Sequence, residues 1–173
     1  MVAPSEKDSA RTNRRTTSER ASDREMVTRR TFDAPVRLVF EAWTTPALFK
    51  QWWVPKSSGA TLLSCEQDVR VGGSYRLMFA HPDFETPMPF FGKYLEVVPE
   101  SRLVWTNEES PEGAVTSVTF EEQDGRTLLV MRELYPSKAA LERAIEGMDE
   151  ALPEAFEQLD EFLAARVTGA GRH

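Results

Sequence analysis

The chain has 173 residues, of which 40% are hydrophobic and 28% charged, with a formal net charge of −7. This composition is typical of one globular domain with a hydrophobic core, and no apolar run approaches the roughly 20 residues that a bilayer span requires. Residues 1–30 hold eight Lys or Arg against five Asp or Glu, and this net +3 leaves −10 on residues 31–173. An acidic body disfavours nucleic-acid binding, because neutralising phosphates requires clustered basic side chains. The single cysteine, Cys65, excludes a disulfide framework and favours a reducing, cytoplasmic location.

Changes in composition predict three segments. Residues 1–25 are rich in Ser, Thr and Arg, have no apolar stretch typical of a secretory signal, and are predicted to be a disordered basic leader. Residues 26–166 are predicted to form the folded domain. Residues 167–173 are predicted to be a disordered tail.

The first elements are a strand and two short helices. Residues 26–34 alternate as a strand would, and Pro35 suits the start of a helix whose apolar face ends at Trp43. Thr45 and Pro46 mark the beginning of a second helix, "ALFKQWW". Residues 42–55, the tryptophan-rich segment, contain three of the four tryptophans in the chain.

Residues 61–135 read as six strands with short connections. The runs "TLLSCE", "SYRLMFA", "FFGKYLEVV", "RLVWTNE", "AVTSVTFEE" and "RTLLVMREL" are rich in β-branched or aromatic residues and are separated by turn residues. Asp124-Gly125 is the clearest hairpin signal. Short connections predict an antiparallel meander, and the proline-rich residues 81–89 predict a rim loop.

The C-terminal part predicts a long amphipathic helix. Apolar residues recur at three- and four-residue spacing from Ile145 to Leu163. Pro153 should kink or split this helix, because proline removes a backbone donor. An antiparallel sheet with helices on one side buries a single face, so the tryptophan-rich segment is predicted to close the gap between the sheet and the long helix.

Several blocks resemble one family in order and spacing. "FDAPVRLVFEAWTTPALFKQWWVP", "DVRVGGSYR", "GKYLEVVPESRLVWT", "VTFEEQDGRTLLVM" and "EGMDEAL" are similar to the SRPBCC (START-like, helix-grip) superfamily, in the branch named for the activator of heat-shock protein 90 ATPase. The resemblance runs from about Thr28 to Leu163. It implies an α+β helix-grip fold, β-α-α-β6-α, with a curved antiparallel sheet around the C-terminal helix and a hydrophobic cavity between them. Where relatives commonly carry Gly-Trp, this chain has Ala151-Leu152 followed by Pro153, which should reshape the cavity.

Strand alternation and the resemblance together predict the residues that line this cavity. In "FFGKYLEVV" either Tyr94 and Glu96 or Lys93 and Leu95 point inward, and the resemblance favours Tyr94. The polar groups that would orient a ligand are Tyr75, Tyr94, Trp105 and Arg132. The alternative is that these side chains only fill a solid core. The full set of expected ligand-binding residues is Trp43, Trp53, Tyr75, Leu77, Phe79, Phe91, Tyr94, Trp105, Val118, Phe120, Val130, Arg132, Met148, Leu152 and Phe156.

Arg132 shares a phase with Leu128 and Val130, and an inward arginine needs a partner because an unpaired buried charge is costly. That partner could be a ligand carboxylate or phosphate, but an internal ion pair with Glu96 or Glu66 is the favoured interpretation.

The sequence predicts no metal site and no cofactor, since the only histidines are His81 and His173. Cys65 is expected to be a small buried thiol rather than a nucleophile.

The leading hypothesis is a cytoplasmic, single-domain protein that binds a hydrophobic or aromatic small molecule, including a lipid. Two alternatives remain: a co-chaperone that activates heat-shock protein 90, which the family name implies, and a cyclase or dehydratase that uses inward Tyr94, Arg132 and Glu96. The expected partners are a small ligand and, under the co-chaperone alternative, a chaperone; no nucleic acid and no membrane span are expected, and the chain is expected to be a monomer or weak homodimer.

Overall fold

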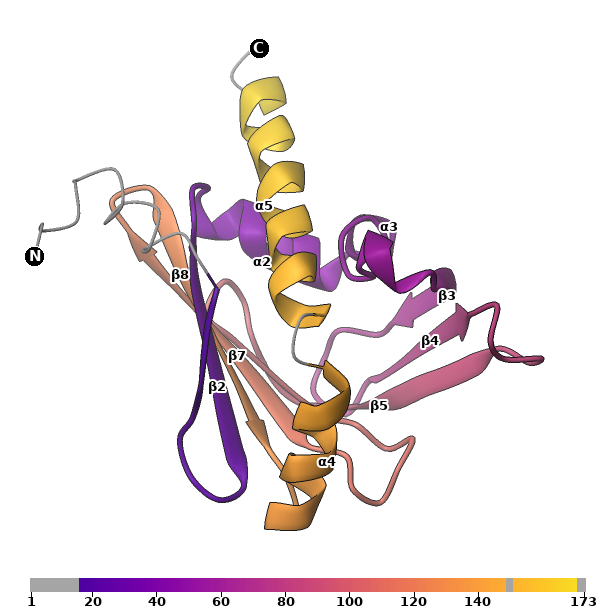
Figure 1. Cartoon of the computed structure of the whole chain (residues 1–173). Helices are drawn as coiled ribbons and strands as arrows, with labels where there is room; N and C mark the ends of the chain where they lie inside the picture. The colour runs from indigo at the N-terminus through magenta and orange to yellow at the C-terminus, as the bar shows by residue number, and fades with distance from the viewer. Residues whose placement is uncertain (1–15, 149–150, 171–173) are drawn as a thin grey trace, which may run out of the picture.

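A computed structural model describes residues 16–148 and 151–170, without the side chains of residues 146–148, 151 and 168–170. It shows an eight-stranded antiparallel sheet in the order β1-β2-β8-β7-β6-β5-β4-β3. The sheet is curved, helix α5 runs along its concave side, and α2 and α3 close one end (Figure 1). This is the predicted helix-grip fold. No helix in the described part of the chain is long and apolar enough to cross a membrane.

The elements follow the predicted order with one strand added. The strands are β1 (Thr17–Arg20), β2 (Glu25–Phe32), β3 (Thr61–Gln67), β4 (Ser74–Ala80), β5 (Met88–Val98), β6 (Arg102–Thr106), β7 (Val115–Gln123) and β8 (Arg126–Leu134). The helices are α2 (Val36–Thr44), α3 (Pro46–Phe49), the 3-10 turn η1 (Lys56–Ser58), α4 (Lys138–Met148) and α5 (Ala151–Ala170).

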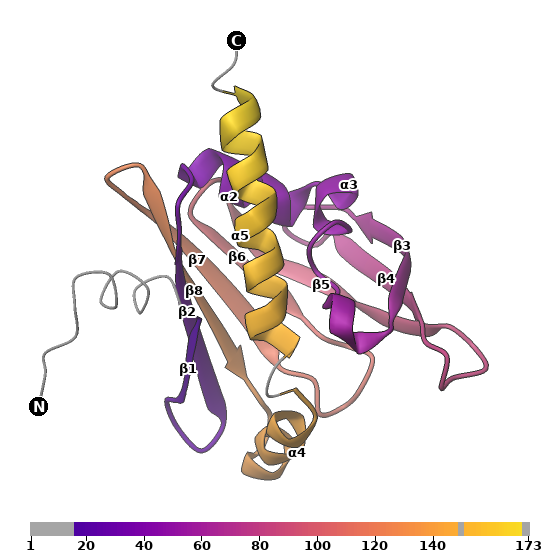
Figure 2. The same cartoon turned by 45° about the horizontal axis from the view of Figure 1, so that its top comes forward.

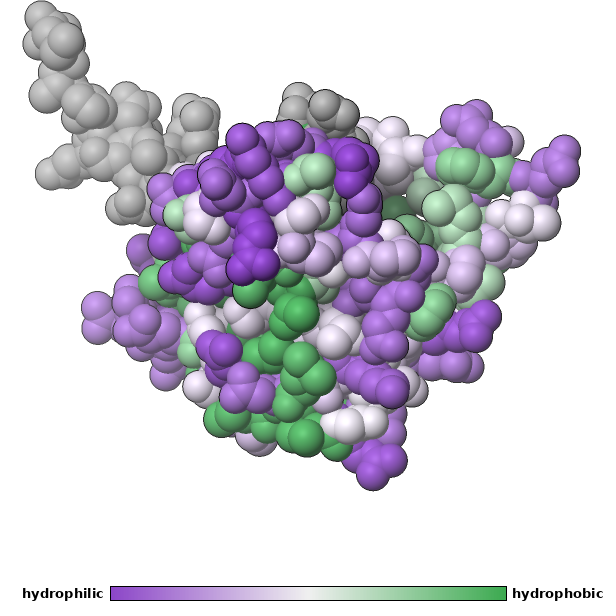
Figure 3. Space-filling view, turned by 90° about the horizontal axis from the view of Figure 1, so that it is seen from below, coloured by the Kyte–Doolittle hydropathy of each residue, from purple (hydrophilic) through white to green (hydrophobic). Residues whose placement is uncertain are grey.

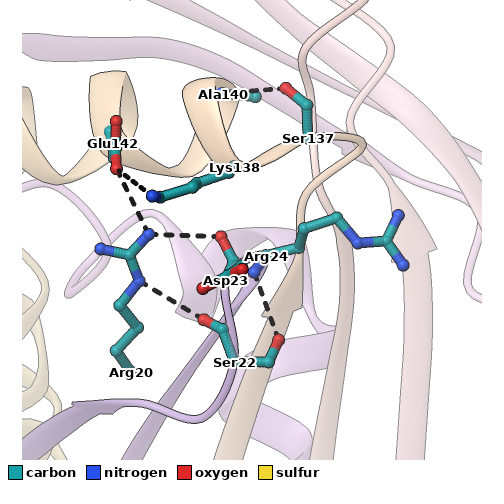
Figure 4. A network of polar contacts seen from close by, with 8 residues as sticks. All are labelled: Arg20, Ser22, Asp23, Arg24, Ser137, Lys138, Ala140 and Glu142. Atoms are coloured by element: carbon teal, nitrogen blue, oxygen red, sulfur yellow. Dashed lines mark hydrogen bonds and ion pairs between the residues drawn. The ribbon is translucent and has the colours of Figure 1, made fainter.

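The prediction of a disordered leader through residue 25 is wrong for its last part. Thr17–Arg20 pair with β2, and the Glu19 carboxylate lies 2.6 Å from the Arg29 guanidinium. The turn that follows is held against α4, because Arg20 lies 3.6 Å from Glu142 and also donates to the carbonyl of Asp23 (Figure 4). Polar residues therefore order this edge through strand pairing and ion pairs rather than through apolar burial. Residues 1–15 lie outside the described residues.

The C-terminal helix is split, as Pro153 predicted. Helix α4 ends at Met148 and α5 begins at Ala151, so Pro153 is the third residue of α5. The first turn tolerates proline because its N–H groups have no partner within the helix. The expected tail from residue 167 is wrong in its first part, since α5 continues to Ala170. Figure 2 shows α4 below α5, at the lower end of the sheet.

The tryptophan-rich segment packs in the core, as expected. The ring centroids of Trp43 and Trp52 are 4.8 Å apart, and Trp43 also contacts Phe156 of α5 at 6.1 Å. The Trp52 indole N–H donates to the Ala42 carbonyl at 3.0 Å. The second helix is shorter than "ALFKQWW", because α3 ends at Phe49 and the residues that follow it continue as turns. These contacts fix the segment between the sheet and α5.

Candidate functional site

A cavity of about 510 Å³ lies between the concave face of the sheet and the helices. This volume is within the range of small-molecule sites. The lining is mainly apolar and aromatic. Its aromatic members are Trp43, Phe49, Trp53, Tyr75, Phe79, Phe84, Phe90, Tyr94, Trp105 and Tyr135.

One inward-facing row of side chains crosses the floor of the cavity from aromatic to acidic. Tyr94 of β5 pairs with Trp105 of β6, which pairs with Thr116 of β7, which pairs with Glu133 of β8. Paired residues on antiparallel strands share a face, and neighbouring strands lie about 4.8 Å apart. Glu133 and Trp105 are therefore separated by two strand spacings, or about 10 Å.

The aromatic end carries polar atoms without partners among the described residues. The Gln67 amide N–H donates to the Trp43 carbonyl at 3.1 Å and to the Tyr94 hydroxyl at 3.3 Å. The Gln67 Oε1 and the Trp43 Nε1 are buried and have no hydrogen-bond partner in that part of the chain. Burial raises the pKa of Tyr94 to about 12, so its hydroxyl stays protonated at neutral pH. A ligand could hydrogen-bond to the Gln67 Oε1 or the Trp43 Nε1 only after a shift of the side chains that cover them, because both atoms have almost no exposed surface.

A hydrogen-bond chain fixes the middle of the cavity. The Tyr75 hydroxyl donates to the Thr106 carbonyl at 2.6 Å and lies 3.1 Å from the Asn107 Oδ1. The Asn107 amide N–H donates in turn to the Ala114 carbonyl at 2.7 Å and to the Thr116 hydroxyl at 2.9 Å. Burial raises the pKa of Tyr75 above its usual range, with a further contribution from Glu109. Tyr75 therefore forms a fixed part of the cavity wall, and its hydroxyl is not free to donate to a ligand.

The far end of the cavity is acidic. Glu133 ends the row described above, and the Tyr135 hydroxyl donates to its carboxyl at 3.4 Å; Glu109, which acts electrostatically on Tyr75, also lines the cavity. Burial raises the pKa of Glu133, which favours its uncharged form. The Glu109 Oε2 is buried without a hydrogen-bond partner among the described residues. Glu133 also borders a second hollow of about 90 Å³, next to Met26 and Pro153.

Helix α5 holds the segment that closes the cavity. The Gln158 amide N–H donates to the carbonyls of Trp52 and Val54 at 3.0 and 2.8 Å, and its oxygen accepts from the Lys56 N–H at 2.8 Å. The Glu154 carboxylate accepts from the backbone N–H and the hydroxyl of Ser57, which lowers the pKa of Glu154. The wall formed by Trp53, Val54 and Pro55 is therefore positioned by polar side chains of α5.

The structure places the predicted site residues in four groups. Eight line the cavity, three are buried in the core without lining it, and three lie on the outer face of the sheet. Met148 lies outside the residues whose side chains are described. The lining residues are Trp43, Trp53, Tyr75, Leu77, Phe79, Tyr94, Trp105 and Leu152; the core residues are Val118, Phe120 and Phe156; the outer residues are Phe91, Val130 and Arg132.

The inward placement of Arg132 and Val130 is wrong. In β8 the buried residues are Thr127, Leu129 and Met131, so the inward phase continues to Glu133. The Arg132 guanidinium lies 3.3 Å from Glu25 and is 45% exposed. Its partner is an acid of β2 on the outer face, and neither Glu96 nor Glu66 is that partner.

Strand β5 corrects two further expectations. Tyr94 is buried and faces the cavity, so Phe90 shares its face while Phe91 points outward and is 38% exposed. A register shift between Tyr94 and Glu96 then moves Glu96 to the surface, where it pairs with Arg102 at 3.0 Å. A catalytic set of inward Tyr94, Arg132 and Glu96 is therefore excluded by this geometry.

Sequence reasoning missed the polar residues that matter most in the cavity. Gln67, Asn107 and Glu109 lie at strand ends or in the β6–β7 loop, where alternation no longer predicts direction. Glu133 was missed because its neighbour Arg132 was assigned to the inner face. Taking Leu129 and Met131 as the inward-facing residues of this strand would have placed Glu133 on the cavity side.

Cys65 and His81 do not form a reactive pair or a metal site in the described residues. Burial raises the pKa of Cys65 to about 11, so its thiolate is scarce at neutral pH. The Asp83 N–H donates to the His81 Nδ1 at 3.0 Å. The His81 Nε2 therefore carries the hydrogen and donates it to the Ser58 carbonyl, 2.9 Å away. No three His, Cys, Asp or Glu side chains gather as a metal site within residues 16–148 and 151–170.

The outer face of the sheet carries exposed apolar residues. Leu95, Val115 and Leu134 are 47%, 39% and 41% exposed, and Val115 pairs directly with Leu134. Seen from below, hydrophobic side chains gather in a stripe flanked by hydrophilic ones (Figure 3). This apolar surface is separate from the cavity.

Comparisons with known proteins agree with the fold. Residues 33–164 match the model of the family described as Activator of Hsp90 ATPase homolog 1-like protein. No curated protein matches the sequence. Solved structures of proteins from Rhodobacter sphaeroides, Nitrosomonas europaea and Mycobacterium smegmatis are similar, with TM-scores of 0.79, 0.77 and 0.74 and identities of 24%, 23% and 24%. The alignments cover 87%, 86% and 87% of this chain and 98%, 99% and 99% of those chains.

Proposed function

Since the chain belongs to the family of Activator of Hsp90 ATPase homolog 1-like proteins, whose helix-grip fold it shares, we propose that it binds a hydrophobic or aromatic small molecule in the cavity between the sheet and α5. The cavity itself carries this proposal. The cavity has a volume of about 510 Å³ and is lined by three of the four tryptophans. A cavity of this size surrounded by aromatic side chains binds ligands mainly by burying their apolar surface.

The unpartnered polar atoms support the same conclusion. Burying an indole N–H or an amide oxygen without a partner costs about 1–3 kcal/mol. Trp43 Nε1 and Gln67 Oε1 are both in this state beside the cavity, within the described part of the chain. A ligand that displaces the side chains covering these two atoms and hydrogen-bonds to them removes that cost and is thereby oriented. The proposal includes a cytoplasmic location, which the single half-buried cysteine supports.

Native mass spectrometry of the purified protein and thermal shifts with a library of lipophilic compounds test this function. A ligand that binds only the folded state raises the melting temperature by several degrees at saturating concentration. Because Trp43, Trp53 and Trp105 line the cavity, binding should also change the intrinsic fluorescence. No adduct, no thermal shift and no fluorescence change with any compound would contradict the proposal.

A matched pair of variants separates cavity binding from surface adsorption. Met88→Trp places a large ring in the lining of the cavity and should reduce or abolish the thermal shift. Leu63→Trp adds the same ring at an exposed position of β3 that is 49% accessible, and should leave the shift unchanged. Equal shifts in both variants would argue that the compounds bind elsewhere.

A second candidate function is the regulation of a heat-shock protein 90 chaperone. Two observations favour it: the family description and the apolar surface formed by Leu95, Val115 and Leu134 on the outer face. Such a surface can contact another protein. An ATPase assay with this chaperone tests the idea. Stimulation that disappears in Leu134→Glu supports it, and no stimulation at excess protein excludes it.

A further inference from the structure

We propose that the ligand is a lipophilic amine whose positive charge is held by Glu133 at the acidic end of the cavity, with Glu109 as a second acidic residue of the cavity lining. This inference rests on the proposed function and specifies the chemical class of the ligand. A cavity with an acidic end and an otherwise aromatic lining favours a ligand that joins a cationic group to an apolar group over a neutral or anionic ligand.

The charged and titratable side chains of the cavity disfavour an anionic ligand. Among the described residues that line it, the carboxylic acids are the two glutamates, none is Lys or Arg, and both ring nitrogens of His81 are already hydrogen-bonded, to Ser58 and Asp83. Residues 146–151, whose side chains are not described, contain no Lys or Arg either. The nearest arginine on β8, Arg132, points to the outer face and pairs with Glu25. A carboxylate or phosphate would therefore be buried without a counter-charge from the described lining residues, which is costly.

The state of the two carboxyl groups favours a cation. The Glu109 Oε2 is buried and has no partner in the described part of the chain, so an ammonium that displaces the groups covering it would gain an unpaired acceptor. Glu133 has one long hydrogen bond, 3.4 Å from the Tyr135 hydroxyl. Burial raises the pKa of Glu133 and favours its neutral form. A nearby ammonium reverses this preference, because an opposite charge favours the carboxylate; the proton of Glu133 then passes to solvent.

The spacing along the sheet fits one molecule with two ends. Glu133 and Trp105 lie two strands apart, about 10 Å, with the small side chain of Thr116 between them. A ring system joined to an aminomethyl group has this length. The indoles of Trp105 and Trp43, whose centroids are 5.9 Å apart, would contact the ring system. Aromatic faces also attract cations, so the path to the acidic end is favourable for an amine.

The test compares three probes with the same naphthyl body: naphthylmethylamine, naphthylmethanol and naphthoate. Dissociation constants are measured by calorimetry and by tryptophan fluorescence at neutral pH. The amine should bind about 10- to 100-fold more tightly than the alcohol, the range that a hydrogen bond to a charged group gives. Naphthoate should bind most weakly. An amine that binds no better than the alcohol would overturn the inference and leave cavity binding intact.

Variants assign the preference to the glutamates. Glu133→Gln keeps the size of the side chain and removes its charge, so the amine should bind as weakly as the alcohol while the alcohol affinity is kept. Glu109→Gln, in the β6–β7 loop, should reduce the preference in part and serves if the first variant does not fold. Glu121→Gln removes an exposed acid of β7 and should change nothing. A preference that survives in both Glu133→Gln and Glu109→Gln contradicts the inference, and failure of every probe to bind contradicts the proposed function as well.

Discussion

Replacing Gln158 by alanine should loosen the tryptophan-rich segment from helix α5. This amide makes three hydrogen bonds to the backbone of one short stretch, at residues 52, 54 and 56, over distances of 2.8 to 3.0 Å. The stretch crosses from the buried Trp52 to the exposed Lys56, and it has no regular secondary structure until η1 begins. Its position beside the cavity therefore depends on side-chain contacts.

The expected loss of stability follows from the burial of these bonds. The two donated bonds to the carbonyls of Trp52 and Val54 are partly buried and contribute about 1 kcal/mol each. The third bond, from the Lys56 N–H, is exposed and contributes less because water replaces it. Gln158→Ala should thus lower the free energy of unfolding by about 2–3 kcal/mol. In urea this corresponds to a midpoint about 1 M lower at an unchanged slope.

Urea unfolding followed by tryptophan fluorescence and by circular dichroism measures this change. Gln123→Ala, at the exposed end of β7, is the matched control and should remain within about 0.5 kcal/mol of the parent. Gln158→Glu keeps the acceptor for Lys56 but points a carboxylate at two carbonyls, so it should destabilise at least as much at neutral pH. A Gln158→Ala protein that unfolds at the parent midpoint would refute the reasoning, since the three bonds would then contribute nothing.

Three further changes test the core, a close backbone approach and the buried acid. Phe156→Ala should cost about 3–5 kcal/mol, because this fully buried ring contacts Phe32 and Trp43; a loss below about 1 kcal/mol in calorimetric melting would contradict the packing. Gly92→Ala should cost about 1–3 kcal/mol, because a Cβ there would lie 2.0 Å from the Thr106 carbonyl oxygen, and unchanged denaturant unfolding would argue against this approach of β5 to β6. Glu133→Gln should become more stable relative to the parent as the pH rises. The raised pKa of Glu133 gives stability that is present below the unfolded value near 4.3 and lost as the pH rises through the folded value. Unfolding measured from pH 4 to 8 checks this, and a difference independent of pH would show that Glu133 is not held in its neutral form.

Most of the architecture could be predicted from local patterns. The order of helices and strands, the hairpin at Asp124-Gly125 and the split before Pro153 each depend on the conformational preference of a few adjacent residues. Asp124 and Gly125 both adopt positive φ values, 54° and 81°, as a tight turn between paired strands requires. The position of Trp43 on a buried helical face also follows from its spacing.

The direction of side chains was predicted only where one face of a strand is apolar and the other polar. In β4 the alternation of Tyr75 and Leu77 with Arg76 is unambiguous, and both apolar residues line the cavity. In β8 the run "LLVM" is apolar on both faces, so the pattern does not reveal whether Arg132 or Glu133 points inward. The pairing of Met131 with Val118 on the inner face resolves this.

The sequence by itself determined the helix-grip order of elements, because helix and turn preferences are properties of neighbouring residues. Only the tertiary structure decided that Arg132 pairs with Glu25 outside while Glu133 and Glu109 face the cavity. That choice depends on strand register, on the register shift after Tyr94 and on the course of the β6–β7 loop. The physical reason is that these features arise from contacts between residues far apart in the chain, and a one-residue change in phase moves every side chain of a strand to the other face.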